Sequence, residues 1–108
     1  NADGVYTSGE GSLLNVSDST IATSGSGSNG LKANGKSTLN ATKTAIEITG
    51  SGSGTYASGT GTVLNLSDSR IHMGQNAGYA VLGINNSTTS LKNVEIITDA
   101  SHSALAVG

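Results

Sequence analysis

The stretch Gly54-Thr55-Tyr56-Ala57-Ser58-Gly59, followed shortly by Leu64-Asn65-Leu66-Ser67-Asp68-Ser69-Arg70-Ile71, decides the fold of this chain because it recurs. Its opening six residues return in looser form at 4–9, 30–35 and 78–83, and a partial fifth copy begins at Ser103. The copies therefore start at a nearly constant spacing along the chain. A fixed period of this length is typical of a solenoid, in which each unit buries its apolar side against its neighbours.

Each copy also alternates apolar and polar residues, which is the period of half-buried strands. Glycine, serine and asparagine separate these strands, and they favour the left-handed conformations of tight corners. The sequence therefore predicts an all-β, right-handed single-stranded parallel β-helix (a β-solenoid) with about four coils of roughly 25 residues and three short strands per coil. Residues 1–108 would form one unit, with coils at about 4–29, 30–53, 54–77 and 78–102 and a partial coil at 103–108.

Stacking the copies predicts which side chains point inward. One column is apolar in every copy and consists of Ile21, Ile46, Ile71 and Ile96. A second column would contain Val5, Leu31, Thr55 and Tyr79, and a third, of mostly small residues, would contain Thr7, Ala33, Ala57, Val81 and Ala106. These columns predict a narrow core, which a chain with only 34% hydrophobic residues can fill.

The outward positions carry a regular charge pattern. Asp18, Lys43 and Asp68 share one column, which would make the charge alternate from coil to coil. The same alignment pairs Glu10 with Lys36, Glu47 with His72, and Arg70 with Glu95. Neighbouring positions on adjacent strands lie about 5 Å apart. We interpret these charges mainly as a means of fixing the strand register, with an active site as the less favoured alternative.

Two further outward features are candidates for function. Tyr6, Lys32 and Tyr56 share a column and could form a cation–π ladder or a carbohydrate-stacking face. The chain also contains five asparagines in Asn-Xaa-Ser/Thr sequences, which are glycosylation acceptors in secreted proteins. They are Asn15, Asn40, Asn65, Asn85 and Asn86. The pattern is explained either by glycosylation or, as we favour, by the repeat itself, in which an outward asparagine precedes an inward apolar residue.

Composition excludes several classes of function. The net charge of −2 and the 3% aromatic content argue against nucleic-acid binding, which needs a basic face. Cysteine is absent, so disulfides and thiolate metal sites are excluded. No apolar run is long enough for a membrane-spanning helix. No leader is recognisable, so we expect any export signal to have been removed or to lie outside this chain.

The candidate acids do not predict an enzyme. The repeat spreads the seven acidic residues over several faces, and no two adjacent positions of a strand face carry an aspartate pair. His72 and His102 fall in different columns and do not suggest a metal site. We therefore expect no catalytic residues, no metal and no cofactor.

Units of the form Gly-Val-Tyr-Thr-Ser-Gly followed by Leu-Asn-Val-Ser-Asp-Ser-Thr-Ile, here residues 4–9 and 14–21, resemble the passenger domains of pertactin-like bacterial autotransporters. The resemblance covers nearly the whole chain and lies in the style of the repeat. It implies a right-handed β-helix that is exported and displayed on the cell surface. It also implies roles in adhesion, self-association or immune evasion. The membrane-embedded barrel of these proteins would have to lie outside this chain.

The sequence leaves two hypotheses for function. The first is a non-enzymatic stalk or adhesin-type module at the bacterial cell surface or secreted, which contacts a host-cell or matrix surface or another copy of itself. The second is a fragment of a polysaccharide-acting or polysaccharide-binding β-helix whose active site lies elsewhere. The apolar residues 104–107 have no polar cap after them. We expect either an internal fragment or ends covered by a second copy, with end-to-end or side-by-side association.

Overall fold

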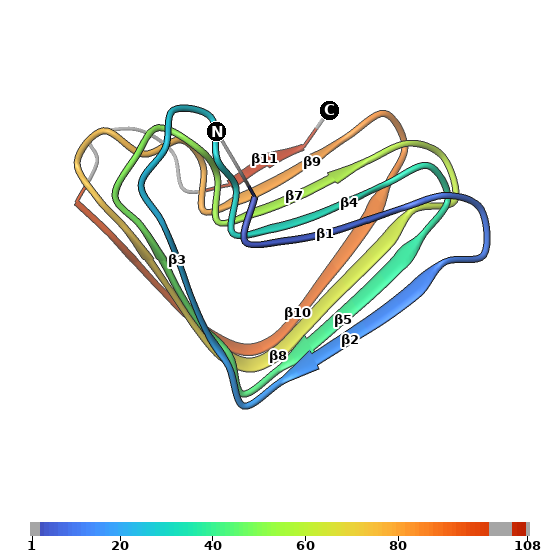
Figure 1. Cartoon of the computed structure of the whole chain (residues 1–108), viewed down its shortest axis with the longest axis horizontal. Helices are drawn as coiled ribbons and strands as arrows, with labels where there is room; N and C mark the ends of the chain where they lie inside the picture. The colour runs from blue at the N-terminus through green and yellow to red at the C-terminus, as the bar shows by residue number, and fades with distance from the viewer. Residues whose placement is uncertain (1–2, 100–104, 108) are drawn as a thin grey trace.

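The computed structural model describes residues 3–99 and 105–107 of the chain (Figure 1). They form a parallel β-solenoid of about four coils, and no helix occurs in these ranges. Every pair of neighbouring strands is parallel. The sequence prediction of an all-β solenoid is therefore confirmed.

The first sheet forms one wall of the solenoid and contains one strand from each coil. Its order along the stack follows the chain, and it lies across the upper part of Figure 1. Its strands are β1 (Val5–Ser8), β4 (Leu31–Asn34), β7 (Thr55–Ser58), β9 (Val81–Ile84) and β11 (Leu105–Val107). Because β4 and β7 each pair on both edges, their backbone groups are occupied by neighbouring strands.

The second sheet is bent into a V that forms the other two walls (Figure 1). In the first two coils each arm is a separate strand, so that these coils have three strands each. In the later coils one long strand runs through the bend. The strands are β2 (Leu13–Ser17), β3 (Thr20–Thr23), β5 (Thr38–Thr42), β6 (Ala45–Ile48), β8 (Val63–Met73) and β10 (Thr88–Thr98).

The bend of the V is made by one column of left-handed residues. Asp18, Lys43 and Asp68 each have a φ of 50°, and Asn93 has a φ of 53°. Asparagine and aspartate tolerate this conformation better than most residues, because their short polar side chains bond locally. The prediction that this column alternates charge from coil to coil identified its residues but not its role, since no ion pair joins Lys43 to either aspartate in the described residues.

Hydroxyl groups one residue after the bend hold its conformation. The hydroxyls of Ser19 and Ser69 donate to the carbonyl oxygens two residues earlier, at 2.8 and 2.7 Å, and Thr44 does the same at 3.0 Å. Each of these bonds spans the left-handed residue of its coil. Side chains that bond to nearby backbone in this way favour turns over continued regular structure.

The repeating glycine lies where the coils touch most closely. A Cβ on Gly30 would meet Ile46 Cγ2 at 2.6 Å and the Gly54 carbonyl oxygen at 2.7 Å. A Cβ on Gly54 would likewise meet the Ala80 carbonyl oxygen at 2.6 Å. Real Cβ atoms do not approach other atoms so closely, so each glycine is required by the isoleucine and the backbone packed against it.

The predicted alignment of the fourth copy is wrong by two residues. The structure pairs Thr55 with Val81, so Ala80 and not Gly78 takes the place of the repeating glycine. Val81 therefore lies in the column predicted for Tyr79, and Gly83 lies next to Ala57 where Val81 was expected. The glycine pattern predicts the wrong register here because this coil has alanine, Ala80, at the position of the repeating glycine. In the fifth copy Val107 pairs with Gly83, so Ala106 is not in the small-residue column where it was predicted. The predicted start of that copy at Ser103 lies outside the described residues.

The corrected register shows that long and short coils alternate. In the first sheet Val5 pairs with Leu31, Leu31 with Thr55 and Thr55 with Val81, so that a long step, a short step and a long step follow one another. In the second sheet all steps are equal, as the register of Leu14, Leu39, Leu64 and Thr89 shows. The long coils carry one extra residue at each of the two corners that flank the first sheet. The structural repeat is thus a pair of coils.

The core lies inside the triangle formed by the three walls. The isoleucine column is confirmed, since Ile21, Ile46, Ile71 and Ile96 are register partners and the first three are buried. Burial of such a side chain contributes about 1.5–3 kcal/mol. The other buried apolar side chains are those of Leu31, Ala33, Leu39, Ala41, Ile48, Ala57, Leu64, Leu66, Met73, Ala77, Ala80 and Val81.

Candidate functional site

The column of Tyr6, Lys32 and Tyr56 forms a contact ladder on the outer face of the first sheet. The three residues are direct register partners on β1, β4 and β7. The Lys32 ammonium lies 5.2 Å from the ring centroid of Tyr6 and 5.3 Å from that of Tyr56. These distances fall within the range of cation–π attraction. The sequence alignment predicted this column, and we call its three residues the Tyr–Lys–Tyr ladder.

Polar groups extend this ladder along the same face. Ser8, Asn34 and Ser58 are the next outward residues on the three strands. The Tyr6 hydroxyl donates to Asn34 Oδ1 at 3.3 Å. Hydrogen bonds from Ser8 and then Asn34 stabilise the phenolate, and the Lys32 charge adds to their effect, so the pKa of Tyr6 is lowered.

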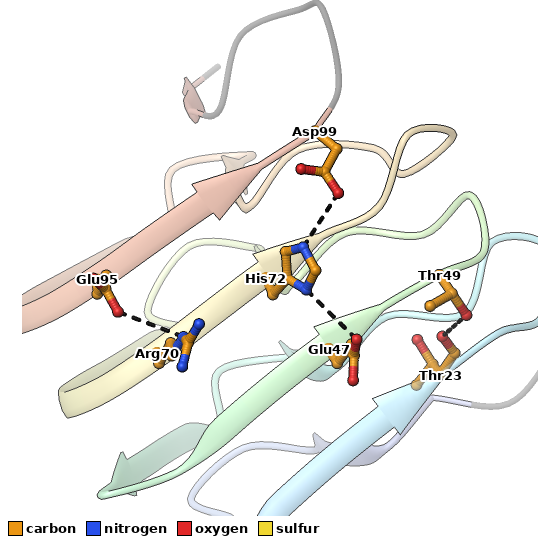
Figure 2. A network of polar contacts seen from close by, with 7 residues as sticks. All are labelled: Thr23, Glu47, Thr49, Arg70, His72, Glu95 and Asp99. Carbon is orange, nitrogen blue, oxygen red and sulfur yellow. Dashed lines mark hydrogen bonds and ion pairs between the residues drawn. The ribbon is translucent and has the colours of Figure 1, made fainter.

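A second candidate site lies on the outer face of the second sheet, around His72 of β8 (Figure 2). It is on the arm of the V that contains β3, β6 and the C-terminal parts of β8 and β10. His72 Nδ1 lies 3.5 Å from Glu47 Oε2 on β6, and Nε2 lies 3.3 Å from Asp99 Oδ2 beyond the end of β10. Arg70 Nε lies 3.4 Å from Glu95 Oε1. We call these five residues the His72 cluster.

A hollow of about 230 Å³ lies beside this cluster. It is lined by Thr20, Ala45, Ile46, Glu47, Arg70 and His72. Ala45 lies between Thr20 and Arg70 in its outward column, and its small side chain leaves the space open. A second, shallower depression shares Ala45 and Arg70 and extends toward the bend.

The ion pairs that the sequence predicted are present. Glu10 Oε2 lies 3.5 Å from Lys36 Nζ, and the pairs of His72 with Glu47 and of Arg70 with Glu95 form as expected. Their side chains are largely exposed, with values from 38% for His72 to 81% for Glu10. Exposed pairs of this kind contribute about 0–1 kcal/mol each.

The expectation that the acidic residues are scattered is wrong for three of them. Glu47, Glu95 and Asp99 come together around Arg70 and His72. The sequence alignment missed Asp99, because it lies one residue beyond the end of β10 and reaches His72 diagonally. Its place one residue after Thr98, the partner of Met73, is the signal that could have found it.

Three of the five possible glycosylation acceptors form a hydrogen-bonded ladder. Asn15, Asn40 and Asn65 are register partners on the second sheet. Asn40 Nδ2 donates to Asn15 Oδ1 at 3.1 Å, and Asn65 Nδ2 donates to Asn40 Oδ1 at 2.8 Å. The amide nitrogens of Asn40 and Asn65, to which a sugar would be attached, are thus engaged between coils. This ladder gives the repeated asparagine a structural role.

The two remaining acceptors lie at a corner. Asn85 and Asn86 have φ angles of 55° and 65°, so they take left-handed positions that glycine holds in other coils. Asn85 Nδ2 donates to Ser58 Oγ at 2.9 Å. Glycosylation at any of the five sites stays a prediction.

Neither a metal centre nor a membrane-spanning helix is found in the described part of the chain. No group of three or more His, Asp or Glu side chains is placed to hold a metal ion within residues 3–99. His102 lies outside the described residues. No helix in the described ranges has the length and apolar character needed to cross a membrane.

Comparisons with protein-family models, with curated proteins and with solved structures found no match for this chain. Its function is therefore inferred from its own residues and geometry.

Proposed function

We propose that this chain is a non-enzymatic segment of a cell-surface or secreted protein, of the kind found in pertactin-like bacterial autotransporters. The solenoid acts as a stiff stalk whose outward side chains make repeated contacts. Its partner is a host-cell or matrix surface or another copy of the chain. The resemblance of the repeat supports this proposal together with the parallel stacking of the coils.

One observation carries the proposal. The outward side chains are held in straight columns across successive coils, as in the Tyr–Lys–Tyr ladder, with strands about 4.8 Å apart. Because a rigid scaffold already holds such side chains in place, they lose little conformational freedom when a partner binds. This lower entropy cost favours binding. Weak contacts repeated along a stalk gain strength through multivalency.

An adhesion assay tests the proposal. Beads are coated with the chain, and their attachment to mammalian cells, to matrix-coated plates and to one another is counted. We expect attachment or clustering well above that of albumin-coated beads. A folded chain whose beads neither attach nor cluster would contradict the proposal. The matched variants are Tyr56→Ser on the ladder and Lys92→Gln on β10, which lies on the other sheet.

A second candidate function is supported by the His72 cluster. Glycosidases use a pair of carboxylates beside the bound sugar. Here Glu47 lines the hollow, and Glu95 and Asp99 contact its neighbours Arg70 and His72. This candidate predicts release of new reducing ends from acidic or neutral polysaccharides, and its loss in Glu47→Gln. Release of no new reducing ends by the folded chain would contradict catalysis by the His72 cluster.

A further inference from the structure

The Lys32 ammonium is held in place without an acidic partner. Its contacts are the two tyrosine rings at 5.2 and 5.3 Å, and no hydrogen bond or ion pair of Lys32 Nζ is found in the described residues. By contrast, Lys36 and Arg70 each form an ion pair with a glutamate. The three N–H donors of the Lys32 ammonium thus have no hydrogen-bond acceptor among the described residues.

The face around Lys32 contains no carboxylate on the described strands β1, β4, β7 and β9. Their outward residues are Tyr6, Ser8, Lys32, Asn34, Tyr56, Ser58, Leu82 and Ile84. Asp3, just before β1, carries a negative charge that acts on Tyr6 and opposes the lowering of its pKa, and its Oδ1 accepts from the Asn29 backbone at 2.9 Å, while Glu10 pairs with Lys36. A chain with net charge −2 therefore presents, on these four strands, a face whose only charge is positive.

We propose that this face binds an acidic polysaccharide, with Lys32 as the group that recognises its carboxylate or sulfate. The proposal builds on the contact role of the ladder proposed above and names its ligand class. An anionic oxygen would accept from the Lys32 ammonium, which forms the strongest kind of hydrogen bond available on this face. The opposite charges of ligand and face also favour association over that with a neutral sugar.

The neighbouring side chains match the rest of a sugar ring. Asn34 offers both a donor and an acceptor, and the hydroxyls of Ser8 and Ser58 can do either. The rings of Tyr6 and Tyr56, on strands two steps apart, provide apolar surface for sugar C–H groups. The face thus combines one cation, several hydroxyl-matching groups and two aromatic rings.

Other polyanions fit this face less well. An acidic peptide that adds to a sheet needs a free strand edge, but both edges of β4 are paired with β1 and β7. Nucleic acid is bound through many phosphate contacts, and this face has a single lysine on its described strands. The acidic peptide remains as an outcome of the test, which includes poly-glutamate.

Titration calorimetry on the chain tests the proposal with three probes, namely a hexamer of galacturonic acid, a neutral hexamer of galactose and poly-glutamate. We expect the acidic hexamer to bind measurably and the other two to bind at least tenfold more weakly. Lys32→Gln should weaken its binding at least tenfold, and Lys32→Arg should retain it. Tyr56→Ser should weaken it severalfold. Lys92→Gln removes the same charge from another face and should leave binding unchanged.

Several results would overturn the inference. Equal binding of the neutral hexamer would exclude recognition of charge, and equal binding of poly-glutamate would show a general polyanion surface. An equal loss in Lys92→Gln and Lys32→Gln would show that no particular face is used. The bead assay separates the two proposals. Adhesion without glycan binding rejects the ligand class alone, whereas glycan binding without adhesion or clustering rejects the stalk or adhesin role.

Discussion

At the scale of single residues, Tyr6 shows how an exposed side chain can be tuned by its neighbours. It receives stabilisation of its phenolate from Ser8, Asn34 and Lys32, all on the same face. In the neutral form its hydroxyl donates to Asn34 Oδ1, and a turned amide would donate to the phenolate instead. The geometry of this face therefore has a measurable consequence in a titration.

We predict that Tyr6 ionises at a lower pH than an unperturbed tyrosine. Its pKa lies below the usual value of about 10, because hydrogen bonds and the Lys32 charge favour the charged form. An ultraviolet titration of phenolate absorbance should lose its earliest step in Tyr6→Phe. In Lys32→Gln that step should move to higher pH. An earliest step that persisted unchanged in Tyr6→Phe would contradict the prediction.

The sign of the linked stability follows from the direction of this shift. A lowered pKa in the folded state favours folding when the phenol is ionised. The contribution of Tyr6 is therefore present above pH 10 and is lost as the pH falls through the lowered pKa of the folded chain. At neutral pH the ladder is held by the cation–π contacts and not by this charge.

At the scale of the strand and the turn, the left-handed bend is the feature that most constrains the sequence. Four coils place Asp18, Lys43, Asp68 and Asn93 at this position. Three of the four residues are aspartate or asparagine, and Lys43 is the exception. Non-glycine residues lose about 1–2 kcal/mol in this conformation, and short polar side chains lose the least.

We predict that Lys43→Asn stabilises the chain by up to about 1 kcal/mol, whereas Lys43→Val destabilises it by about 1 kcal/mol or more. Asparagine can also bond to an adjacent aspartate, as Asn93 Nδ2 does to Asp68 Oδ1 at 3.1 Å. Valine is branched at Cβ and is strained at a φ of 50°. Urea unfolding of the two variants and the parent checks the order, and a valine variant as stable as the asparagine one would contradict it.

The strands could be predicted from sequence, but the bend and one register could not. Alternation of apolar and polar residues identifies the inward Ile46 and the outward Lys32, because a strand has a strict period of two. The bend could not be predicted because an aspartate in the left-handed conformation cannot be told from an outward aspartate of an extended strand by its sequence alone. The fourth register could not be predicted because Ala80 replaces the glycine on which the copies align.

The candidate sites divide in the same way. The Tyr–Lys–Tyr ladder could be predicted because its members are direct partners on paired strands. The His72 cluster could be predicted only in part, because Asp99 lies one residue beyond the end of β10 and its contact with His72 is diagonal. Aligning the repeats identifies partners on neighbouring strands. The contacts of residues beyond the strand ends depend on the path of the corner and cannot be identified in this way.

At the scale of the whole molecule, the stack is held mainly by its narrow core and its backbone hydrogen bonds. The ion pairs between coils lie outside the core and are exposed by 38% or more. Pairs of this kind are screened by salt. The core column of Ile46 and Ile71 is not, because its contribution comes from burial of apolar surface.

We therefore predict that the stability of the chain depends little on salt. Raising NaCl from 10 mM to 1 M shortens the Debye length from about 30 Å to about 3 Å and should lower the free energy of unfolding by less than about 1 kcal/mol. Thermal and urea unfolding at both salt concentrations measure this change. A several-fold larger loss would show that the exposed pairs, and not the core, hold the coils together.

Two columns on the surface have different spacings along the stack. The asparagine ladder advances by one strand, about 4.8 Å, while Tyr6 and Tyr56 of the first sheet are two strands, about 9.6 Å, apart and both lie in long coils. Val5 and Thr55 hold equivalent positions in two long coils, with the short coil of Leu31 between them. Duplication of a pair of coils would lengthen the solenoid and keep tyrosines on every second strand of the first sheet. Duplication of a single coil would break this spacing. Growth by pairs of coils would thus preserve the order of side chains on this face.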